Sequence, residues 1–352
     1  MSDAAPLETA LTQPEALLRD GLVRREDMEA LALVAQDFRI RITPEMRAAI
    51  AVPGDAVAAQ FVPSPAELAT RPEDLPDPIG DDVHQAAPGL THRYPDRAIL
   101  HITKTCDVYC RFCFRRETVG ETGPLPEADL EAALRYIAAT PALREIILTG
   151  GDPLTLSPRR LESVLERLSA ITHITTLRIH TRVPVVAPGR ITPGLVAMLR
   201  GLRPALWLVV HTNHAQELTA PARAALARLA DAGVPLLSQS VLLRGVNNSP
   251  EALFGLFRAL QENRVKPYYL HHCDLARGAG HFRTTIAEGR ALMAGLRGHL
   301  SGPALPAYVL DIPGGFGKVP VSADHFAPGP RPGLWLVTDW QGRVHVYADP
   351  QS

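Results

Sequence analysis

From residue 93 to residue 300, short apolar runs alternate with longer stretches in which apolar residues recur every three or four positions. The first pattern is typical of buried strands and the second of helices with one apolar face. The sequence predicts six strands, at Ala98–Ile102, Glu145–Leu148, Thr176–His180, Leu206–His211, Pro235–Val241 and Pro267–His271. It predicts six helices, at Glu127–Ala138, Pro158–Ala170, Thr192–Arg200, Ala220–Ala232, Pro250–Asn263 and Thr285–Leu300. Consecutive βα units favour a parallel α/β sheet, and the pattern fits a partial barrel as well as a doubly wound sheet.

The residues before this core predict helices and loops. Helices are expected at Pro14–Leu18 and Arg25–Ala35, and Thr43 with Pro44 forms a helix start with an N-cap and a proline in the first turn. The segment 63–88 is rich in proline and acidic residues, and we expect an ordered arm that lies on the core. Residues 1–92 therefore form an N-terminal helical region with an arm.

The last 52 residues, 301–352, differ again from the core. They predict a strand at Tyr308–Asp311, a glycine-rich loop at 313–318 and a closing hairpin. The hairpin strands are Leu334–Thr338 and Arg343–Tyr347, joined by a turn at 339–342. The expected division is thus 1–92, 93–300 and 301–352.

Composition narrows the class of protein. Apolar residues make up 46% of the 352 residues and charged residues 21%, which fits a globular chain rather than a disordered one. The net charge is 36 − 37 = −1, so we expect no nucleic-acid partner. No apolar run approaches the length of a membrane span, the first residues lack the pattern of a secretory signal, and four cysteines are too few for a disulfide scaffold. We therefore expect a cytoplasmic protein without a membrane partner.

Three of the four cysteines lie in one short window. Cys106, Cys110 and Cys113 form a C-x3-C-x2-C pattern directly after the first core strand. Such clustering indicates a metal, and three thiolates can hold three irons of a [4Fe–4S] cluster while the fourth iron stays open. A structural zinc site would need a fourth ligand, which the distant Cys273 could supply. The remaining interpretation is that the three cysteines are buried thiols without a metal.

Two glycine-rich segments are further candidates. The second core strand ends in Thr-Gly-Gly-Asp-Pro at 149–153, where glycines allow the backbone to approach a ligand closely. The segment Pro-Gly-Gly-Phe-Gly-Lys at 313–318 lacks the spacing and the Ser or Thr of a phosphate-binding P-loop. Its Lys318 suits a Schiff base with pyridoxal phosphate (PLP), although a surface turn with a solvated lysine explains the segment equally well.

The cysteine motif after the first strand is similar to the signature of the radical S-adenosylmethionine (SAM) superfamily. That similarity implies that Cys106, Cys110 and Cys113 bind a [4Fe–4S] cluster, whose open iron is chelated by SAM before SAM is cleaved to a 5′-deoxyadenosyl radical. The Gly-Gly-Asp turn resembles the superfamily's loop that contacts the methionine part of SAM. It implies SAM-binding roles for Gly150, Gly151 and Asp152.

Longer stretches resemble the lysine 2,3-aminomutase family over about residues 92–321. They are His92–Arg97, Arg178–Arg182, Ser238–Asn247, Tyr268–Thr284 and Asp311–Pro320. The resemblance implies a radical SAM partial (βα)6 TIM-like barrel, with an N-terminal helical region and a C-terminal extension that contains β-strands. It also implies PLP as a second organic cofactor.

Residue roles follow from the resemblance position by position. Lys318 would be the catalytic lysine that carries PLP as a Schiff base. The remaining roles would be Arg93, Tyr94 and Arg97 at the PLP phosphate, His211 and Gln239 at SAM, Arg115 at the substrate carboxylate, and Asp274 and Asp311 at the substrate ε-ammonium. The two aspartates also make physical sense by themselves, because a buried ammonium must be neutralised by carboxylates.

The larger relatives use further cysteines for zinc at a subunit interface. Here Ser249 stands in the corresponding internal loop and no cysteine follows Cys273, so zinc is not expected. The short chain is similar to the branch of the family that converts lysine for attachment to elongation factor P. Asp311, in contrast, favours free L-lysine as the substrate.

The sequence therefore predicts an isomerase that converts L-lysine into L-β-lysine by moving the amino group from C2 to C3. Its partners would be a small amino acid substrate, a reducing electron donor and further copies of the chain in a homo-oligomer. Three alternatives stay open: the same chemistry on another amino acid or for elongation factor P, a radical SAM enzyme without PLP, and a non-enzymatic iron–sulfur or zinc protein.

Overall fold

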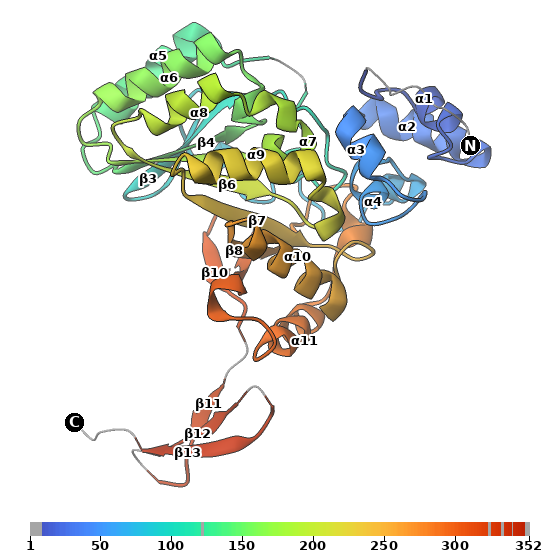
Figure 1. Cartoon of the computed structure of the whole chain (residues 1–352), viewed down its shortest axis with the longest axis vertical. Helices are drawn as coiled ribbons and strands as arrows, with labels where there is room; N and C mark the ends of the chain where they lie inside the picture. The colour runs from blue at the N-terminus through green and yellow to red at the C-terminus, as the bar shows by residue number, and fades with distance from the viewer. Residues whose placement is uncertain (1–8, 121–122, 323–324, 332–333, 340, 349–352) are drawn as a thin grey trace.

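The computed structural model describes residues 9–120, 123–322, 325–331, 334–339 and 341–348, and a ten-stranded sheet forms its body (Figure 1). The strands are β1 Gln85–Ala87, β2 Leu90–Tyr94, β3 Arg97–Thr103, β4 Glu145–Gly150, β5 Thr176–Thr181, β6 Ala205–His211, β7 Leu236–Leu242, β8 Lys266–His272, β9 Ala307–Asp311, β10 Lys318–Pro320, β11 Phe326–Pro328, β12 Leu334–Thr338 and β13 Val344–Ala348. The helices are α1 Pro14–Arg19, α2 Met28–Asp37, α3 Pro44–Ala49, α4 Ala58–Phe61, α5 Glu127–Ala138, α6 Pro158–Ala170, α7 Val183–Val186, α8 Pro193–Arg200, α9 Ala220–Asp231, α10 Pro250–Glu262 and α11 Ile286–Leu296.

The strands β3 to β9 are parallel, and each lies beside the next one in the sequence. The first six of them, β3 to β8, are the six predicted strands, with ends that differ by at most two residues. Antiparallel strands extend the sheet at both edges, β1 and β2 at one and β10 at the other. The α/β fold class expected from the sequence is confirmed.

The sheet curves until its two edges approach one another. The Tyr94 hydroxyl of β2 accepts a hydrogen bond from the backbone N–H of Lys318 in β10, at 3.0 Å. Near the same place, the amide of Gly314 donates to the carbonyl of Pro78. Helices α5, α6, α8 and α9 lie on the outer face (Figure 1), so the inner face is left to line a cavity.

Short polar residues set where the core helices begin. Helices α6, α8, α9, α10 and α11 each start after a Ser or Thr whose hydroxyl accepts a hydrogen bond from a backbone amide of the first turn. Thr43 caps α3 in the same way, as predicted. Helix α11 is shorter than the predicted Thr285–Leu300, because Arg297 is extended and Gly298 adopts a left-handed conformation with φ of +77°.

The N-terminal region contains strands that the sequence analysis missed. Strands β1 and β2 are short, and the expected boundary at residue 92 falls inside β2. The stretch predicted as one helix at Arg25–Ala35 is a 3₁₀ turn at Arg25–Asp27 followed by α2. The arm 63–88 packs on the core, where the Leu75 amide donates to the carbonyl of Leu275 at 2.8 Å.

The C-terminal strands β11, β12 and β13 form a separate antiparallel sheet that extends away from the main body (Figure 1). Two of them are the predicted hairpin strands, and β11 is an addition. Trp340 of the predicted turn lies outside the described residues, as do residues 1–8, to which the prediction about a secretory signal applied. Among the described helices, none combines the length and the apolar character needed to cross a membrane.

Candidate active site

One cavity of about 490 Å³ lies against the inner face of the curved sheet. Side chains of β2 to β9 line it, together with the first residue of β10. Nine of the predicted site residues meet there: Arg93, Tyr94, Arg97, Arg115, His211, Gln239, Asp274, Asp311 and Lys318. Positions far apart in the sequence therefore line one cavity.

Lys318 enters the cavity because β10 folds back antiparallel to β9, which places it directly opposite Asp311. Its Nζ lies 2.5 Å from Oδ1 of Asp311, and Nδ1 of His271 lies 2.9 Å from Oδ2. Burial raises the pKa of Asp311, but the hydrogen bond from His271 and the charge of Lys318 outweigh it and lower that pKa to about 2. Burial also lowers the pKa of His271, so a neutral His271 donates to a charged Asp311.

Asp274 faces the same cavity two residues beyond the end of β8. Its carboxylate has no hydrogen-bond partner among the described residues. Burial and then the nearby charge of Asp311 raise the pKa of Asp274 to about 7. A cation bound between the two carboxylates would relieve this repulsion, because it attracts both of them.

Two cavity arginines share one internal carboxylate. The Nε of Arg115 lies 2.7 Å from Oδ2 of Asp81, and Nη2 of Arg93 lies 3.6 Å from Oδ1. Asp81 comes from the arm, so the arm sets the orientation of both arginines. The Nε of Arg93 is buried without a partner and is a spare donor for a ligand.

Tyr94 and Arg97 are placed by the turn between β2 and β3. The Arg97 guanidinium stacks on the Tyr94 ring, with 3.9 Å from Cζ to the ring centroid. The Tyr94 hydroxyl in turn holds the backbone of Lys318, as described above. The Arg97 guanidinium therefore lies beside Tyr94, the residue that holds the backbone of Lys318.

His211 and Gln239 occupy neighbouring positions on β6 and β7, directly opposite one another in the register. Nε2 of His211 lies 3.4 Å from Nδ1 of His180. Burial, followed by the charge of Arg182, lowers the pKa of His211 to about 3, so the imidazole is neutral. Both predicted SAM-side residues therefore lie on the same wall of the cavity.

The cysteine loop follows β3 and borders the cavity, since Phe114 and Arg115 directly after Cys113 belong to the lining. Burial raises the pKa of all three cysteine thiols, that of Cys113 to about 11. No group of three or more His, Cys, Asp or Glu side chains in the described part of the chain is arranged around one metal ion. A [4Fe–4S] cluster does not require that arrangement, because each thiolate binds a different iron.

The Gly-Gly-Asp turn packs directly on the cysteine loop. A Cβ on Gly151 would lie 2.3 Å from the carbonyl oxygen of Thr105, and Gly150 has φ of +109°, which side chains rarely adopt. The backbone amide of Asp152 donates to the same Thr105 carbonyl at 2.8 Å. The Asp152 carboxylate is engaged internally, where it accepts hydrogen bonds from Thr181 Oγ1 and from the backbone of Leu154 and Arg182.

Four residues with specific roles in this geometry were missed by the sequence analysis: Asp81, Arg182, Glu217 and His271. His271 could have been found from strand alternation, because it lies two positions after Tyr269 on the cavity-facing side of β8. The other three act through contacts between distant segments. Arg182 ends the stretch 178–182 that resembles the family, but the sequence analysis assigned it no role, and no local pattern marks Asp81 or Glu217.

Two family models match this chain. Residues 100–257 match the model of the Radical SAM superfamily, and residues 293–352 match the model described as Lysine-2,3-aminomutase. The L-lysine 2,3-aminomutase of Fusobacterium nucleatum is 42% identical over 93% of this chain and 77% of its own length. That of Clostridium subterminale is 41% identical over 93% and 79%. The chain belongs to the lysine 2,3-aminomutase family.

A less similar relative is the glutamate 2,3-aminomutase of Clostridioides difficile, 34% identical over 96% of this chain and 80% of that protein. Among solved structures, a radical SAM methyltransferase from Sphaerobacter thermophilus is similar over 63% of this chain and 67% of its own, with 20% identity and a TM-score of 0.46. Members of the lysine 2,3-aminomutase family are isomerases that use a [4Fe–4S] cluster, SAM and PLP. Because the chain belongs to this family of isomerases, the alternative of a non-enzymatic iron–sulfur or zinc protein is excluded.

Proposed function

We propose that this enzyme converts L-lysine into L-β-lysine by moving the amino group from C2 to C3. The observation that carries this proposal is the cavity itself. It places one lysine and two carboxylates, Lys318, Asp274 and Asp311, beside the cysteine loop. The two carboxylates select a substrate with a cationic side chain, and they oppose glutamate by like-charge repulsion.

The residues present fit the family's cofactors. Cys106, Cys110 and Cys113 would hold the cluster, and the backbone of Gly150, Gly151 and Asp152 with His211 and Gln239 would hold SAM. Arg93, with its spare buried Nε, and Arg97 would bind the phosphate of PLP, for which arginine is well suited. When bound, these cofactors together supply the radical that abstracts hydrogen and the conjugated system that stabilises an unpaired electron on the substrate.

The chain's own residues position the substrate. Arg115 keeps its terminal guanidinium nitrogens for the substrate carboxylate while its Nε stays on Asp81. Asp311 is paired with the Lys318 ammonium and is held by His271. If Lys318 carried PLP, its Nζ would no longer pair with Asp311, and the Asp311 carboxylate would be available to the substrate ε-ammonium beside Asp274. One carboxylate would thus serve two ammonium groups in turn.

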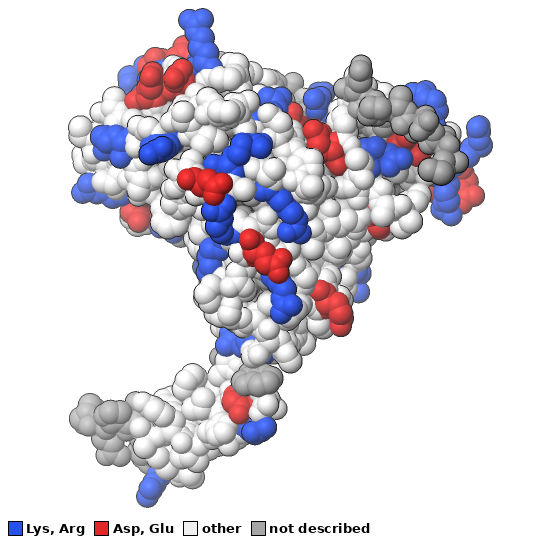
Figure 2. Space-filling model, viewed as in Figure 1, with Lys and Arg blue, Asp and Glu red and all other residues white. Residues whose placement is uncertain are grey.

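We also propose that the enzyme works as a homo-oligomer through the sheet β11–β13. Large apolar side chains of this sheet are exposed, with 60% of Phe326, 65% of Val346 and 52% of Tyr347 accessible. Figure 2 shows few charges on the visible face of this lobe. An exposed apolar surface of this kind is typical of an interface, and a second copy of the chain is the partner we propose. Light scattering of Val346→Glu should show smaller particles than the unaltered enzyme.

A reducing compartment and a one-electron donor complete the proposal. The four cysteines are free thiols, which agrees with the cytoplasm. A low-potential electron carrier would reduce the cluster.

The first test uses the small number of lysines in the chain, Lys104, Lys266 and Lys318. Protein incubated with PLP and then reduced with borohydride should carry the pyridoxyl group on Lys318, as read by peptide mass spectrometry. Anaerobic enzyme with a reconstituted cluster, PLP, SAM, dithionite and L-lysine should form β-lysine, and L-glutamate should give no product. Labelling of Lys104 or Lys266 alone would refute the assigned lysine. Turnover of glutamate but not of lysine would refute the substrate.

A further inference from the structure

The three cysteines of the loop differ in what their sulfurs contact. No side chain in the described part of the chain donates a hydrogen bond to the sulfur of Cys106 or of Cys113. Cys110 instead receives a charged donor, since Nη1 of Arg182 lies 2.9 Å from its Sγ. Charge-assisted hydrogen bonds are about twice as strong as neutral ones. One ligand position of the cluster is therefore electrostatically distinct from the other two.

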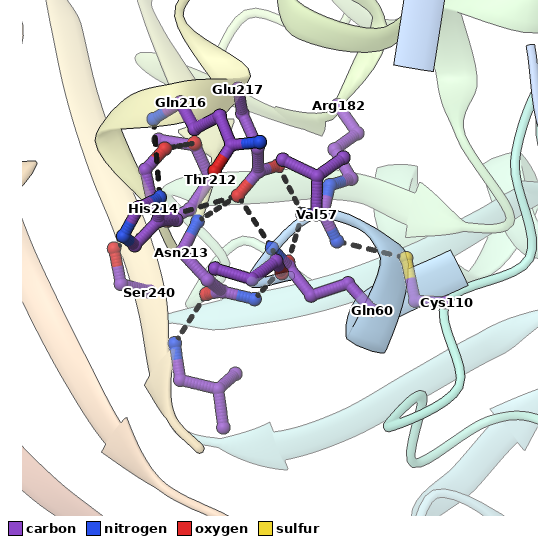
Figure 3. A network of polar contacts seen from close by, with 12 residues as sticks. Val57, Gln60, Cys110, Arg182, Thr212, Asn213, His214, Gln216, Glu217 and Ser240 are labelled. Atoms are coloured by element: carbon purple, nitrogen blue, oxygen red, sulfur yellow. Dashed lines mark hydrogen bonds and ion pairs between the residues drawn. The ribbon is translucent and has the colours of Figure 1, made fainter. Parts of the chain in front are cut away.

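Arg182 is held in this position by buried partners of its two terminal nitrogens (Figure 3). Its Nη2 donates to Oε2 of Glu217 at 2.5 Å and to Oε1 of Gln60 at 2.7 Å. Both partners are fully buried. Gln60 Nε2 donates to Oε1 of Glu217 at 3.0 Å, and the same oxygen accepts the backbone amide of Asn213 at 2.7 Å. The carboxylate that neutralises Arg182 thus cannot turn away without breaking several hydrogen bonds.

The same residue also links the cysteine loop to the Gly-Gly-Asp turn. The backbone amide of Arg182 donates to Oδ2 of Asp152 at 2.6 Å, while its side chain reaches Cys110. The guanidinium also lies over the rings of Phe61 and Phe112, at 4.8 and 5.4 Å from the centroids. Arg182 is 7% exposed, so water does not screen its charge from the sulfur.

We propose that Arg182 is a positioning residue that donates a charged hydrogen bond to Cys110 and thereby raises the reduction potential of the cluster. This inference rests on the proposed function, which makes Cys110 a ligand. Reduction adds one electron, from an external one-electron donor, to the oxidised cluster and makes the cluster and its sulfurs more negative. An N–H···S bond stabilises the reduced form more than the oxidised form, and hydrogen bonds to the sulfurs are known to set such potentials.

The test is a redox titration of the cluster without SAM, followed by EPR of the reduced form. We expect Arg182→Met to lower the equilibrium constant for reduction about tenfold, which is about 59 mV for a one-electron couple. Arg182→Lys should shift it less, because the charge remains while the planar fork is lost. The matched control is Arg190→Met, since Arg190 pairs with Asp107 at 2.7 Å beside the loop and contacts no cysteine sulfur.

A shift in Arg182→Met no larger than in Arg190→Met, at equal iron content, would overturn the inference. If Arg182→Met fails to hold a cluster, the inference is tested on the unaltered protein instead. With arginine labelled with ¹⁵N in the guanidinium group only, pulsed EPR of its reduced cluster should show a ¹⁵N coupling that disappears in Arg182→Lys, and no such coupling would equally overturn the inference. An unaltered protein that binds no cluster at all would instead contradict the proposed function.

Discussion

Arg115 and Arg116 are adjacent in the sequence, yet they belong to two sets of buried charges with opposite properties. Arg115 points into the cavity, where the charges are incompletely paired and Asp274 has no hydrogen-bond partner among the described residues. Arg116 points to the fully buried Glu67, which also accepts hydrogen bonds from Arg111 at 2.6 and 3.0 Å and from the backbone of Ser64. Incomplete pairing leaves groups available for ligands. The fully engaged Glu67 carboxylate attaches the arm to the cysteine loop.

The difference predicts that changes in the cavity reduce activity and change stability only slightly, whereas changes around Glu67 mainly reduce stability. Buried charges are stable only when they are paired, so removal of one partner from a closed set leaves an uncompensated charge. In the cavity, the unaltered protein already contains buried charges that are incompletely paired, so a substitution there adds little further free-energy cost. Measuring both activity and stability for substitutions in the two sets tests this distinction.

The largest effect is expected for Lys318→Ala. Activity should fall on the order of 10⁴-fold or more, because the substitution removes the group that binds PLP. Anaerobic urea unfolding should show only a small loss of stability, because the buried Asp311 loses the Lys318 ammonium but keeps the hydrogen bond from His271. Lys266→Ala is the matched control, because Lys266 lies outside the cavity and bonds only to backbone carbonyls. Equal activity losses in the two variants would contradict the prediction.

Glu67→Ala should have the largest effect on stability, about 3–5 kcal/mol, because Arg111 and Arg116 are left buried without their carboxylate. The measurement is the midpoint of anaerobic urea unfolding. Glu127 also pairs with two arginines, Arg160 and Arg167, but on the surface. Glu127→Ala should therefore cost only about 0–1 kcal/mol. Similar losses of stability in Glu67→Ala and Glu127→Ala would contradict the distinction between buried and exposed sets of paired charges.

Asp274→Asn should be as stable as the unaltered protein or more stable at neutral pH. The pKa of Asp274 is raised from its ordinary value near 3.8 to about 7, so the folded state favours the protonated form. The unaltered protein therefore loses stability, relative to the variant, as pH rises from about 4 to about 7. Unfolding at several pH values should show a difference that widens over this range and then stays constant.

The same group predicts a pH dependence of substrate affinity. The charged form of Asp274 attracts the ε-ammonium, so KM for lysine should decrease as pH rises through about 7. This decrease should be absent in Asp274→Asn, whose KM should be about 10- to 100-fold higher, on the scale of a charge-assisted hydrogen bond. An unchanged pH profile of KM would contradict the assigned contact.

The smallest effect is expected for Tyr94→Phe. It removes the hydroxyl that accepts from the Lys318 backbone and should cost about 0.5–1.5 kcal/mol, seen as a several-fold weaker affinity for PLP. Tyr136→Phe is the control, because Tyr136 also uses its hydroxyl in one hydrogen bond, to His92, outside the cavity. Its affinity for PLP should be unchanged. A loss of affinity in Tyr136→Phe equal to that in Tyr94→Phe would refute a local effect.

Periodicity and local spacing predicted most of the secondary structure. Helices α5 and α6 have the predicted bounds, and the six predicted strands lie in sequence order in one sheet. These features depend on residues within one turn or one strand, such as the caps Ser157 and Ser249. The short strands β1, β2, β10 and β11 were missed because three to five residues carry little periodic signal.

The sequence by itself determined the parallel α/β core, the cysteine loop and, through family similarity, the side chains that meet in the cavity. Only the tertiary structure decided which carboxylate faces which cation. Asp81 and Arg115 are 34 residues apart, Gln60 and Glu217 are 157 apart, and Arg182 and Cys110 are 72 apart. The strength of these pairings depends on distance and burial, both of which arise only when the curved sheet brings its strand ends together.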